Sequence, residues 1–471
     1  MLRVKGASYS TLLVLILAIL LPLSAQAVEY TVSTYAGGGS TAGCSATATA
    51  TNAVNVNSPW GIATDSAGNV YYSNRGTFSI CKITTNGTVV RVAGTGVSGT
   101  GADNIQATSS ALGDPMGVAV DSTGVLYIAD YGLSRSIRRV GLDGVITTIL
   151  NTSRLTTVSG TGGLATAAGS SGPLALAIAP NGDIYFSDYQ SNYIRRIDSS
   201  GYVRAVAGTG LGGNNGDGGA ATSATISQVA GLAFDSAGNL YLASYGGTIR
   251  MVSTAGTISK VAGSYSTIGH TGNDGPANSA TFRNLWGIAI DAADNIFVPE
   301  RGQSPLGTTI RKVNISTGIV TVIAGLDGSG SLTDGQSSAA RFNSPYGVAI
   351  GPNGDLFVAD LGTARIRKIA QAAATSASGS APSLSTSTLG AFRTTSSITA
   401  TGGASGKITF FANGKRISGC ISITYSGSHT CSWKPTIRGA ITVTAKVVTS
   451  NNETLATNSV SVTALTRATR R

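Results

Sequence analysis

Pro59-Trp60-Gly61-Ile62-Ala63-Thr64-Asp65-Ser66-Ala67-Gly68-Asn69-Val70-Tyr71-Tyr72-Ser73-Asn74 is the stretch that decides the fold, because related stretches return five more times along the chain. The counterparts start at Pro115, Pro173, Val229, Leu285 and Pro345, so successive copies lie 56 to 60 residues apart. Self-similarity at a period of this length is the signature of a repeat architecture, and it outweighs every other signal in a sequence.

Each copy contains four short runs of β-type residues. In the second copy they span residues 117–121, 125–130, 137–140 and 145–149. The first run is almost wholly apolar, as in a strand buried on both faces, whereas the third alternates apolar with basic residues. Four strands per repeat, joined by turns that carry Gly or Asn, predict a propeller blade whose strands follow one another from the inside outwards.

The sixth copy lacks the fourth run, because it ends at Ile366-Arg367-Lys368-Ile369. A run of the missing kind lies at the other end of the chain, as Tyr30-Thr31-Val32-Ser33-Thr34-Tyr35-Ala36-Gly37. We expect this strand to complete the last blade and to leave no unpaired inner edge. The sequence therefore predicts an all-β fold, a six-bladed β-propeller over residues 28–370 that is closed by an N-terminal strand.

Four recurring motifs carry a resemblance to a known family. They are the Pro-x-Gly-hydrophobic-Ala start, the Asp-Ser-x-Gly-Asn hairpin, the Tyr-x-Ala-Asp end and the Ile-Arg-Arg-Val strand. Over roughly residues 30–370 the chain resembles the NHL-repeat family of β-propellers, and interblade loops such as 216–222 and 273–277 are similar to those of a common bacterial subtype. The resemblance implies the fold and leaves the function open.

Residues 1–27 have the layout of a secretory signal peptide. Arg3 and Lys5 precede an apolar run from Leu12 to Leu23, and Ala25-Gln26-Ala27 offers a cleavage site. The run is shorter than the roughly 20 residues that a membrane helix needs. We therefore expect a secreted or periplasmic protein of the cell envelope that is not an integral membrane protein; retention as an uncleaved anchor is the alternative.

The four cysteines fall into two pairs, Cys44 with Cys81 near the first blade and Cys420 with Cys431 near the C-terminus. An even count in an exported chain, divided between two regions, predicts one disulfide in each region. Free thiols are the alternative, and no pair has the spacing of metal ligands.

The C-terminal part differs from the repeats. Residues 371–382 are rich in Gln, Ala, Ser and Gly without periodicity, which is typical of a linker. Alternating runs at 396–400, 407–411 and 440–448, with a Gly-Ser-His-Thr turn at 427–430, resemble bacterial immunoglobulin-like modules. This resemblance implies a small β-sandwich over residues 383–471.

The net charge of +11 is concentrated at the two ends of the chain. From residue 371 onward ten Lys or Arg face Glu453 alone, a balance of +9, and the signal peptide adds +2, so the propeller itself is neutral. The basic surface of the C-terminal domain comprises Lys407, Lys415, Arg416, Lys434 and Arg438. It suits docking to an anionic surface, with a merely solvated basic face as the alternative; export and sparse aromatics argue against nucleic acid as a partner.

Two sets of repeat positions should converge at one mouth of the central channel. The first set precedes each inner strand and contains Trp60, Met116, Leu174, Ala230, Trp286 and Tyr346. The second set ends each second strand and contains Asn74, Asp130, Asp188, Ser244, Glu300 and Asp360. Aromatic rings beside carboxylates suit a sugar or a peptide, so we predict a ligand site of Trp60, Trp286, Tyr346, Glu300, Asp130 and Asp188. Packing that plugs the channel is the rival explanation.

The acidic positions have a structural explanation as well. An arginine recurs in the third strand, at Arg138, Arg195, Arg311 and Arg367, where it can pair with the carboxylate of its own blade. Blade one replaces both members, with Asn74 and Cys81, whereas blade four keeps Arg250 opposite Ser244.

A catalytic role would require a histidine or a bound metal ion at the channel mouth. Relatives of this family that are lyases use histidine, but His270 lies in an interblade loop and His429 in the C-terminal domain, away from the positions that face the channel. A calcium site built from Glu300, Asn74, Asp130 and Asp188 would need no histidine. We predict no other cofactor.

The sequence thus favours an exported bacterial binding or scaffold module for a glycan or protein at the cell envelope. The alternative is a Ca²⁺-dependent lyase or lactonase with its site at the channel mouth. We favour binding over catalysis, and the sequence does not name the ligand.

Overall fold

The structure is a computed structural model that describes residues 30–45, 47–302, 308–326 and 332–371, and in the C-terminal part 383–388, 396–401, 406–413, 415–420, 423–425, 428–433, 439–449, 454–456 and 460–464. The predicted signal peptide and residues 372–382 of the linker predicted over 371–382 lie outside the described residues, whereas Gln371 ends the strand Arg365–Gln371. The chain divides into two compact units, Glu29–Ala373 and Ala374–Arg471, which are treated separately below.

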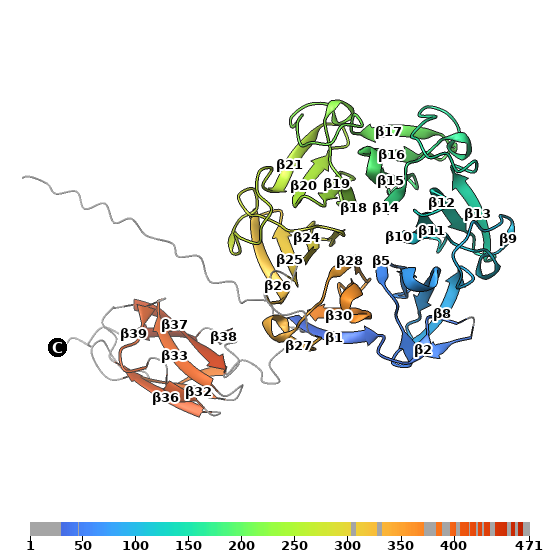
Figure 1. The fold of residues 1–471 in the computed structure, drawn as a ribbon. Coiled ribbons are helices and arrows are strands. Elements are labelled where there is room, and N and C mark those ends of the chain that lie inside the picture. Colours follow the sequence, from blue (N-terminus) through green and yellow to red (C-terminus); the bar gives the residue numbers. More distant parts are fainter. Residues whose placement is uncertain are drawn as a thin grey trace, which may run out of the picture. The chain divides into compact units, whose positions relative to one another are not determined.

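Six antiparallel sheets stand around a ring in the first unit (Figure 1). Each contains four main strands in sequence order from the centre outwards, and the sixth borrows its outer strand from the N-terminus. Blade one comprises β5 (Pro59–Thr64), β6 (Val70–Asn74), β7 (Ser79–Ile83) and β8 (Thr88–Ala93); blade two, β10 (Pro115–Val120), β11 (Leu126–Asp130), β12 (Ser136–Val140) and β13 (Val145–Leu150); blade three, β14 (Pro173–Ile178), β15 (Ile184–Asp188), β16 (Tyr193–Ile197) and β17 (Val203–Ala207). Blade four comprises β18 (Val229–Phe234), β19 (Leu240–Ser244), β20 (Thr248–Val252) and β21 (Ile258–Gly263); blade five, β23 (Ala289–Ile290), β24 (Ile296–Arg301), β25 (Thr308–Asn314) and β26 (Ile319–Gly325); blade six, β28 (Pro345–Ile350), β29 (Leu356–Asp360) and β30 (Arg365–Gln371).

The N-terminal strand closes the ring as predicted. Strand β1 (Tyr30–Ala36) lies between β30 and the short β27 (Gly335–Gln336), with Val32 opposite Ile369. Similar two-residue strands, β3 (Thr49–Ala50), β9 (Ile105–Gln106) and β22 (Gly275–Pro276), cover the outer edges of blades one, two and five. The outer edges of blades one, two, five and six are thereby paired within the chain, which reduces their tendency to template aggregation.

The repeated glycine has a packing cause in the inner strands. A Cβ atom built on Gly61 would lie 2.2 Å from the carbonyl oxygen of Met116 in the next blade, and one on Gly347 would lie 2.4 Å from the carbonyl oxygen of Trp60. Inner strands of neighbouring blades therefore approach one another through their backbones, and a side chain at this position would push the blades apart.

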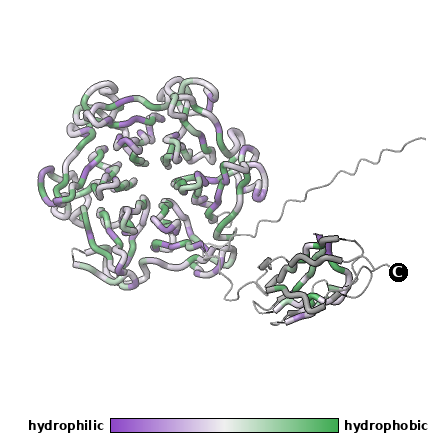
Figure 2. The backbone as a smooth tube through the Cα atoms, turned by 180° about the vertical axis from the view of Figure 1, so that it is seen from behind, coloured by the Kyte–Doolittle hydropathy of each residue, from purple (hydrophilic) through white to green (hydrophobic). Residues whose placement is uncertain are grey.

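Apolar cores lie between neighbouring blades. The core that joins blades one and six contains Val70, Tyr72, Ala359 and Ile366, all buried, and equivalent clusters fill the other interfaces. In Figure 2 hydrophobic segments recur in the strands of every blade. Because every blade buries apolar surface against both neighbours, closing the ring contributes as much packing as any other interface.

Two disulfides connect the predicted cysteine pairs. Cys44, in the segment that follows β1, bonds Cys81 on β7, and Cys420 bonds Cys431. Both predictions are confirmed. Within the described part of the chain, no helix has the length and hydrophobicity that a membrane crossing would need.

The second unit consists of two antiparallel sheets around one core. One sheet contains β31 (Ser383–Thr388), β32 (Ser396–Thr401) and β36 (Ser428–Trp433); the other contains β33 (Gly406–Ala412), β34 (Lys415–Arg416), β35 (Ile423–Tyr425), β37 (Gly439–Thr449), β38 (Thr454–Ala456) and β39 (Val460–Ala464). Ile398 from the first sheet and Phe410 and Val443 from the second are buried in the common core. The turn predicted at 427–430 was wrong, because Ser428, His429 and Thr430 pair with β32 as a strand.

Candidate functional site at the channel mouth

The starts of the inner strands and the ends of the second strands share one face of the propeller. Pro59 pairs with Asn74, and Pro115 pairs with Asp130. The register shifts between Pro59 and Ile62, so the irregularity of the strand includes Trp60 and Gly61. A bulge re-aims a side chain and raises the local twist. The two sets of positions that the repeats define therefore meet at the same mouth of the channel.

The aromatic residues of the first set form one cluster. The ring centroids of Trp60 and Tyr346 lie 4.0 Å apart, those of Trp60 and Trp286 lie 5.0 Å apart, and those of Trp286 and Tyr346 lie 5.2 Å apart. On the other side of the ring Met116, Leu174 and Ala230 are buried against them. Trp60 and Trp286 remain partly exposed, whereas Tyr346 is buried.

A third set of residues surrounds this cluster, and sequence reasoning missed it. Each member directly follows an acidic-set position, so the repeat itself carried the signal; the members are Arg75, Tyr131, Tyr189, Tyr245, Arg301 and Leu361. Tyr245 meets Trp286 edge-on at 5.0 Å, while the guanidinium groups of Arg75 and Arg301 each lie 5.2 Å from the ring centroids of Trp60 and Tyr346, respectively. Tyrosine rings and guanidinium groups thus frame the aromatic cluster.

The carboxylates of the second set bind the backbone of their own blades. Asp188 accepts the N–H groups of Ser171 and Gly172 and pairs with Arg195, and both charged side chains are buried. Asp360 accepts the N–H of Asn343 at 2.8 Å and lies 3.4 Å from Arg367. These contacts hold the loop that leads into each inner strand.

The predicted pairing of acid with arginine is confirmed in three of the four blades for which it was made. Arg195, Arg311 and Arg367 lie within ion-pair distance of Asp188, Glu300 and Asp360, respectively. In blade two it was wrong, because Arg138 pairs instead with Asp103 in the preceding interblade loop, 3.0 Å away. Asp130 accepts the N–H groups of Gly113 and Asp114 and the hydroxyl of Ser134.

Glu300 contacts His270, which was predicted from the sequence to lie in an interblade loop away from the positions that face the channel. The interblade loop brings His270 Nδ1 to 2.6 Å from Glu300 Oε2. The same carboxylate accepts the N–H of Arg283 at 2.9 Å and the hydroxyl of Thr309 at 3.2 Å, and Arg311 lies 3.5 Å away. These four contacts come from blade five and the loop that enters it.

The four candidate calcium ligands have separate environments. Asn74 accepts the N–H of Asn57 at 2.8 Å, while Asp130, Asp188 and Glu300 are engaged as described above. Among the described residues, no three or more His, Cys, Asp or Glu side chains gather in an arrangement that would hold a metal ion. These oxygens are already used as hydrogen-bond acceptors within their own blades.

Burial shifts the protonation of several mouth residues. It raises the pKa of Asp360 to about 6, although Thr363, Asn343 and Arg367 favour its ionised form. Burial also raises the pKa of Asp130 and of Tyr346, and it raises the pKa of Tyr189 to about 12. Tyr189 and Tyr346 are therefore neutral hydrogen-bonding groups at physiological pH.

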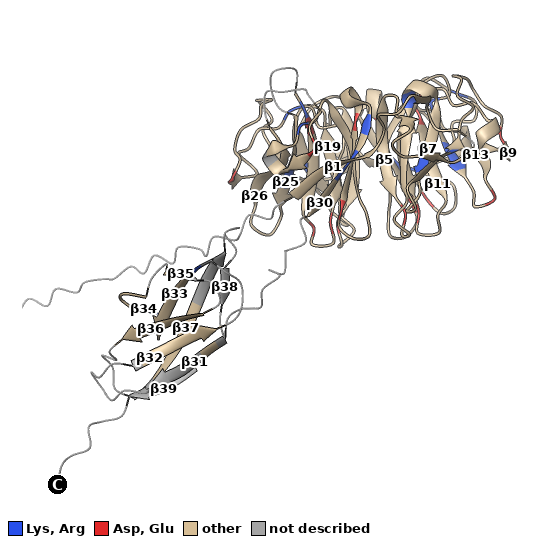
Figure 3. Ribbon diagram, turned by 90° about the horizontal axis from the view of Figure 1, so that it is seen from below, with Lys and Arg blue, Asp and Glu red and all other residues tan. Residues whose placement is uncertain are grey.

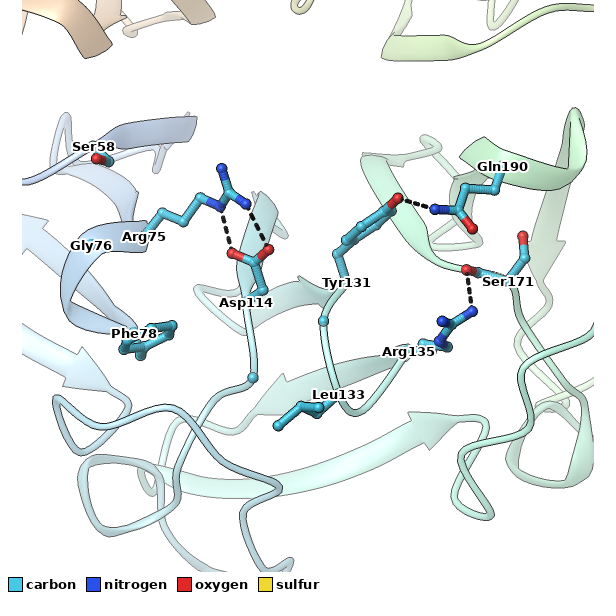
Figure 4. A pocket seen from close by; sticks show the side chains of 12 residues that line it. Ser58, Arg75, Gly76, Phe78, Asp114, Tyr131, Leu133, Arg135, Ser171 and Gln190 are labelled. Atoms are coloured by element: carbon cyan, nitrogen blue, oxygen red, sulfur yellow. Dashed lines mark hydrogen bonds and ion pairs between the residues drawn. The ribbon is translucent and has the colours of Figure 1, made fainter.

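A groove opens on this face between blades one and two, and its volume is about 600 Å³ (Figure 4). Arg75 donates from Nε and Nη2 to Asp114 at 2.6 and 2.9 Å, which joins the two blades across it. Tyr131 receives a hydrogen bond from Gln190 of blade three at 2.6 Å. Phe78 and Leu133 supply apolar surface, and 66% of Leu133 is exposed. We call this space the mouth groove.

The basic residues of the C-terminal unit are described in part. Lys407, Lys415 and Arg416 are exposed on β33 and β34, whereas Lys434 and Arg438 lie outside the described residues. In the propeller, charges of both signs occur around the ring (Figure 3).

Comparison with known sequences points to one kind of domain. The family of the Teneurin NHL domain matches residues 96–162. Teneurin-3 of Danio rerio is 29% identical over 281 residues, an alignment that covers 57% of this chain and 8% of the teneurin. Teneurin-m of Drosophila melanogaster is 27% identical over 292 residues, covering 56% of this chain and 10% of that protein. The chain thus spans about a tenth or less of the length of the curated relatives it matches.

Solved structures share the fold at low sequence identity. A protein of unknown function from Bacteroides thetaiotaomicron superimposes with a TM-score of 0.55 and 18% identity, covering 73% of this chain and 76% of that one. An auxiliary nutrient binding protein from Bacteroides ovatus gives a TM-score of 0.52 and 18% identity, covering 72% and 76%. These structures show the fold alone; together with the six repeats and the closed ring of sheets, the match to the Teneurin NHL domain supports an NHL-repeat β-propeller in the first unit of this chain.

Proposed function

We propose that this protein is an exported binding module of the bacterial cell envelope and that it takes a glycan in the mouth groove. The observation that carries the proposal is the groove itself, in which apolar and polar groups lie side by side. Ring faces of the kind that Tyr131 and Phe78 offer stack on the apolar faces of sugars, while charged and amide groups bind sugar hydroxyls.

The polar groups of the groove are arranged for hydroxyl recognition. The Arg75–Asp114 pair offers donors and acceptors next to Tyr131, and Arg135 is held by the carbonyl oxygen of Ser171 at 2.9 Å. Groups fixed by such contacts lose little freedom on binding, which favours affinity. The groove draws residues from three blades, so the closed ring sets its shape.

A Ca²⁺-dependent lyase or lactonase is the weaker proposal. It would require Glu300, Asp130, Asp188 and Asn74 to exchange their present backbone partners for a metal ion. The propeller fold also occurs in auxiliary nutrient binding proteins of Bacteroides, which agrees with a binding role at the level of fold alone.

Binding of envelope oligosaccharides to the mature protein, measured by calorimetry after a glycan-array screen, tests the glycan site. We expect Tyr131→Ala to weaken binding by about tenfold or more, as for a central aromatic contact. Tyr202→Ala is the matched control, because Tyr202 is an exposed tyrosine outside the groove. Equal loss in both variants, or binding that Tyr131→Ala leaves intact, contradicts the proposal; binding of a peptide in place of any glycan does so as well.

We further propose that the basic C-terminal unit docks to an anionic surface. The support is the charge balance of +9 from residue 371 onward, with Lys407, Lys415 and Arg416 exposed. Co-sedimentation of the mature protein with anionic vesicles at low and physiological salt tests it. The Lys415→Glu/Arg416→Glu variant should bind less, whereas Arg154→Glu/Arg204→Glu on the propeller should bind as the parent does.

A further inference from the structure

Blade four breaks the pattern of the second set of mouth positions. The equivalent residue is a carboxylate in blades two, three, five and six, and each carboxylate accepts the N–H of the residue 17 positions earlier; the pairs are Asp130 with Gly113, Asp188 with Ser171, Glu300 with Arg283, and Asp360 with Asn343. In blade four the position is held by Ser244, and the residue 17 positions earlier is Ser227. A hydroxymethyl group thus replaces a longer anionic side chain.

A cavity of about 250 Å³ lies at this place. Ser244 and Thr248 are 4% and 2% exposed and form its inner part, while residues 265–268 of the following interblade loop are exposed at its rim. Its other lining residues are Gly246 and four polar, uncharged residues, namely Asn214, Ser227, Gln228 and Ser264. We call this space the blade-four cavity.

Two buried polar atoms in the cavity wall have no hydrogen-bond partner. They are the Thr248 hydroxyl and Asn214 Oδ1. Thr248 lies opposite Ser244 just as Thr309 lies opposite Glu300, and in blade five Thr309 donates its hydroxyl to that carboxylate at 3.2 Å. The Thr248 hydroxyl therefore faces the place where its counterpart meets an anion. In blade two, where the hydroxyl of Ser136 is also unpartnered, Ser134 donates to Asp130 instead.

Arg250 supplies positive charge near the same place. It is 1% exposed and holds the same register relative to Ser244 as Arg367 holds relative to Asp360. Arg367 lies within ion-pair distance of two carboxylates, Asp334 and Asp360, whereas the only carboxylate that pairs with Arg250 among the described residues is Asp217, at 2.7 Å. In the neighbouring blades Arg195 and Arg311 pair with the carboxylate at the position of Ser244, which blade four lacks.

We propose that the blade-four cavity binds the carboxylate of a small hydroxylated acid, which occupies the position that the acidic side chain fills in the other blades. A carboxylate accepts hydrogen bonds from hydroxyl and N–H groups, which the wall offers, and a nearby guanidinium strengthens them. The cavity is larger than a carboxylate alone requires, and its hydroxyl and amide lining suits the hydroxyl groups of a sugar acid. The site is separate from the mouth groove and does not depend on the function proposed there.

Calorimetry on the mature protein, with glucuronate as the probe and glucose and acetate as comparisons, tests this site. We expect glucuronate to bind, acetate to bind more weakly and glucose not to bind. Ser244→Asp should reduce glucuronate affinity at least tenfold, because the new side chain supplies the missing carboxylate. Aspartate occupies this position in three other blades, so the variant should fold. Ser223→Asp, which adds the same charge at an exposed site, should leave binding unchanged.

A second variant separates hydrogen bonding from simple filling of the cavity. Thr248→Val keeps the shape and removes the unpartnered hydroxyl, so we expect about a three- to tenfold loss of glucuronate affinity. A disaccharide that ends in glucuronate distinguishes a free acid from the end of a glycan, according to which binds more tightly. The proposal is overturned if glucose binds as well as glucuronate, if no acid binds, or if Ser244→Asp binds as the parent does.

Discussion

Blades one and four both lack the carboxylate that the other four blades carry at the end of the second strand, and they differ in what stands in its place. Blade one replaces acid and arginine together: Asn74 still accepts the N–H of Asn57 at 2.8 Å, and Cys81 is bonded to Cys44. Blade four replaces the acid alone. Asp217 neutralises Arg250, but no side chain fills the blade-four cavity and the Thr248 hydroxyl has no hydrogen-bond partner.

The difference teaches where a repeat protein can acquire a ligand site. A buried charge must be neutralised, and in blade four a loop aspartate does so alone, where blade six pairs its arginine with both a loop aspartate and the strand carboxylate. Blade one keeps the backbone hydrogen bond through the Asn74 amide oxygen and places a disulfide at the arginine position. A departure that restores charge without restoring volume leaves a cavity with polar walls.

The largest loss of stability should come from replacing the buried carboxylate of blade three by serine, the residue that blade four has at this position. Asp188→Ser leaves Arg195 buried without its carboxylate, and blade three has no ion pair from a loop aspartate to Arg195 among the described residues. We expect the free energy of unfolding to fall by about 3–5 kcal/mol, measured by urea denaturation. A loss below about 1 kcal/mol would show that charge pairing contributes little to blade stability.

Removing the disulfide of blade one should lower the free energy of unfolding slightly less than Asp188→Ser does. Cys44→Ser/Cys81→Ser opens a loop with a sequence separation of 37 residues, and we expect a loss of about 3 kcal/mol. The control is Cys420→Ser/Cys431→Ser, which should leave the unfolding transition of the propeller in place because that bond belongs to the other compact unit. Equal effects of the two variants on the propeller transition would contradict this account.

Asp360 in blade six should make the stability of the protein depend on pH. Its pKa of about 6 lies above the value of about 3.9 for an unfolded chain, so the native state binds more protons between these values. The parent should therefore gain stability relative to Asp360→Asn as the pH falls from 7 to 4, by about 2 kcal/mol at most. Thermal melts of both proteins across this range measure the difference; parallel curves would refute the elevated pKa.

Filling the blade-four cavity should change the free energy of unfolding by a smaller amount and should raise it. Ser244→Asp gives Thr248 and Arg250 a carboxylate neighbour, so we expect the free energy of unfolding to rise by about 1 kcal/mol. Chemical denaturation without added acid measures it, with Ser223→Asp as the control. Destabilisation by Ser244→Asp alone would mean that the cavity does not match the acidic sites of the other blades.

The smallest effect on stability is expected in the mouth groove. Arg75 and Asp114 are partly exposed, so Arg75→Ala should change the free energy of unfolding by less than about 1 kcal/mol. The same change should weaken glycan binding. Arg75 would then contribute to ligand recognition, whereas the buried arginines contribute to stability. Strong destabilisation by Arg75→Ala would place this pair with the structural ones.

Local repetition determined most of the architecture. Six copies of one pattern set the blade boundaries, and a fourth strand missing at one end and present at the other required that β1 close the ring. The disulfides followed from an even cysteine count in an exported chain, and the carboxylate and arginine pairs of three blades followed from their fixed repeat positions. Strands, hairpins and contacts within a blade are local, so a repeated sequence specifies them repeatedly.

The tertiary structure decided what the interblade loops do. These loops bring partners from outside the strands: Asp103, Asp217 and Asp334 pair with the arginines of blades two, four and six, and His270 meets Glu300. The same holds across blades, where Arg75 meets Asp114 and Gln190 meets Tyr131. Such contacts depend on where the closed ring brings non-repeating segments together, which is why the mouth groove and the blade-four cavity were visible only in the fold.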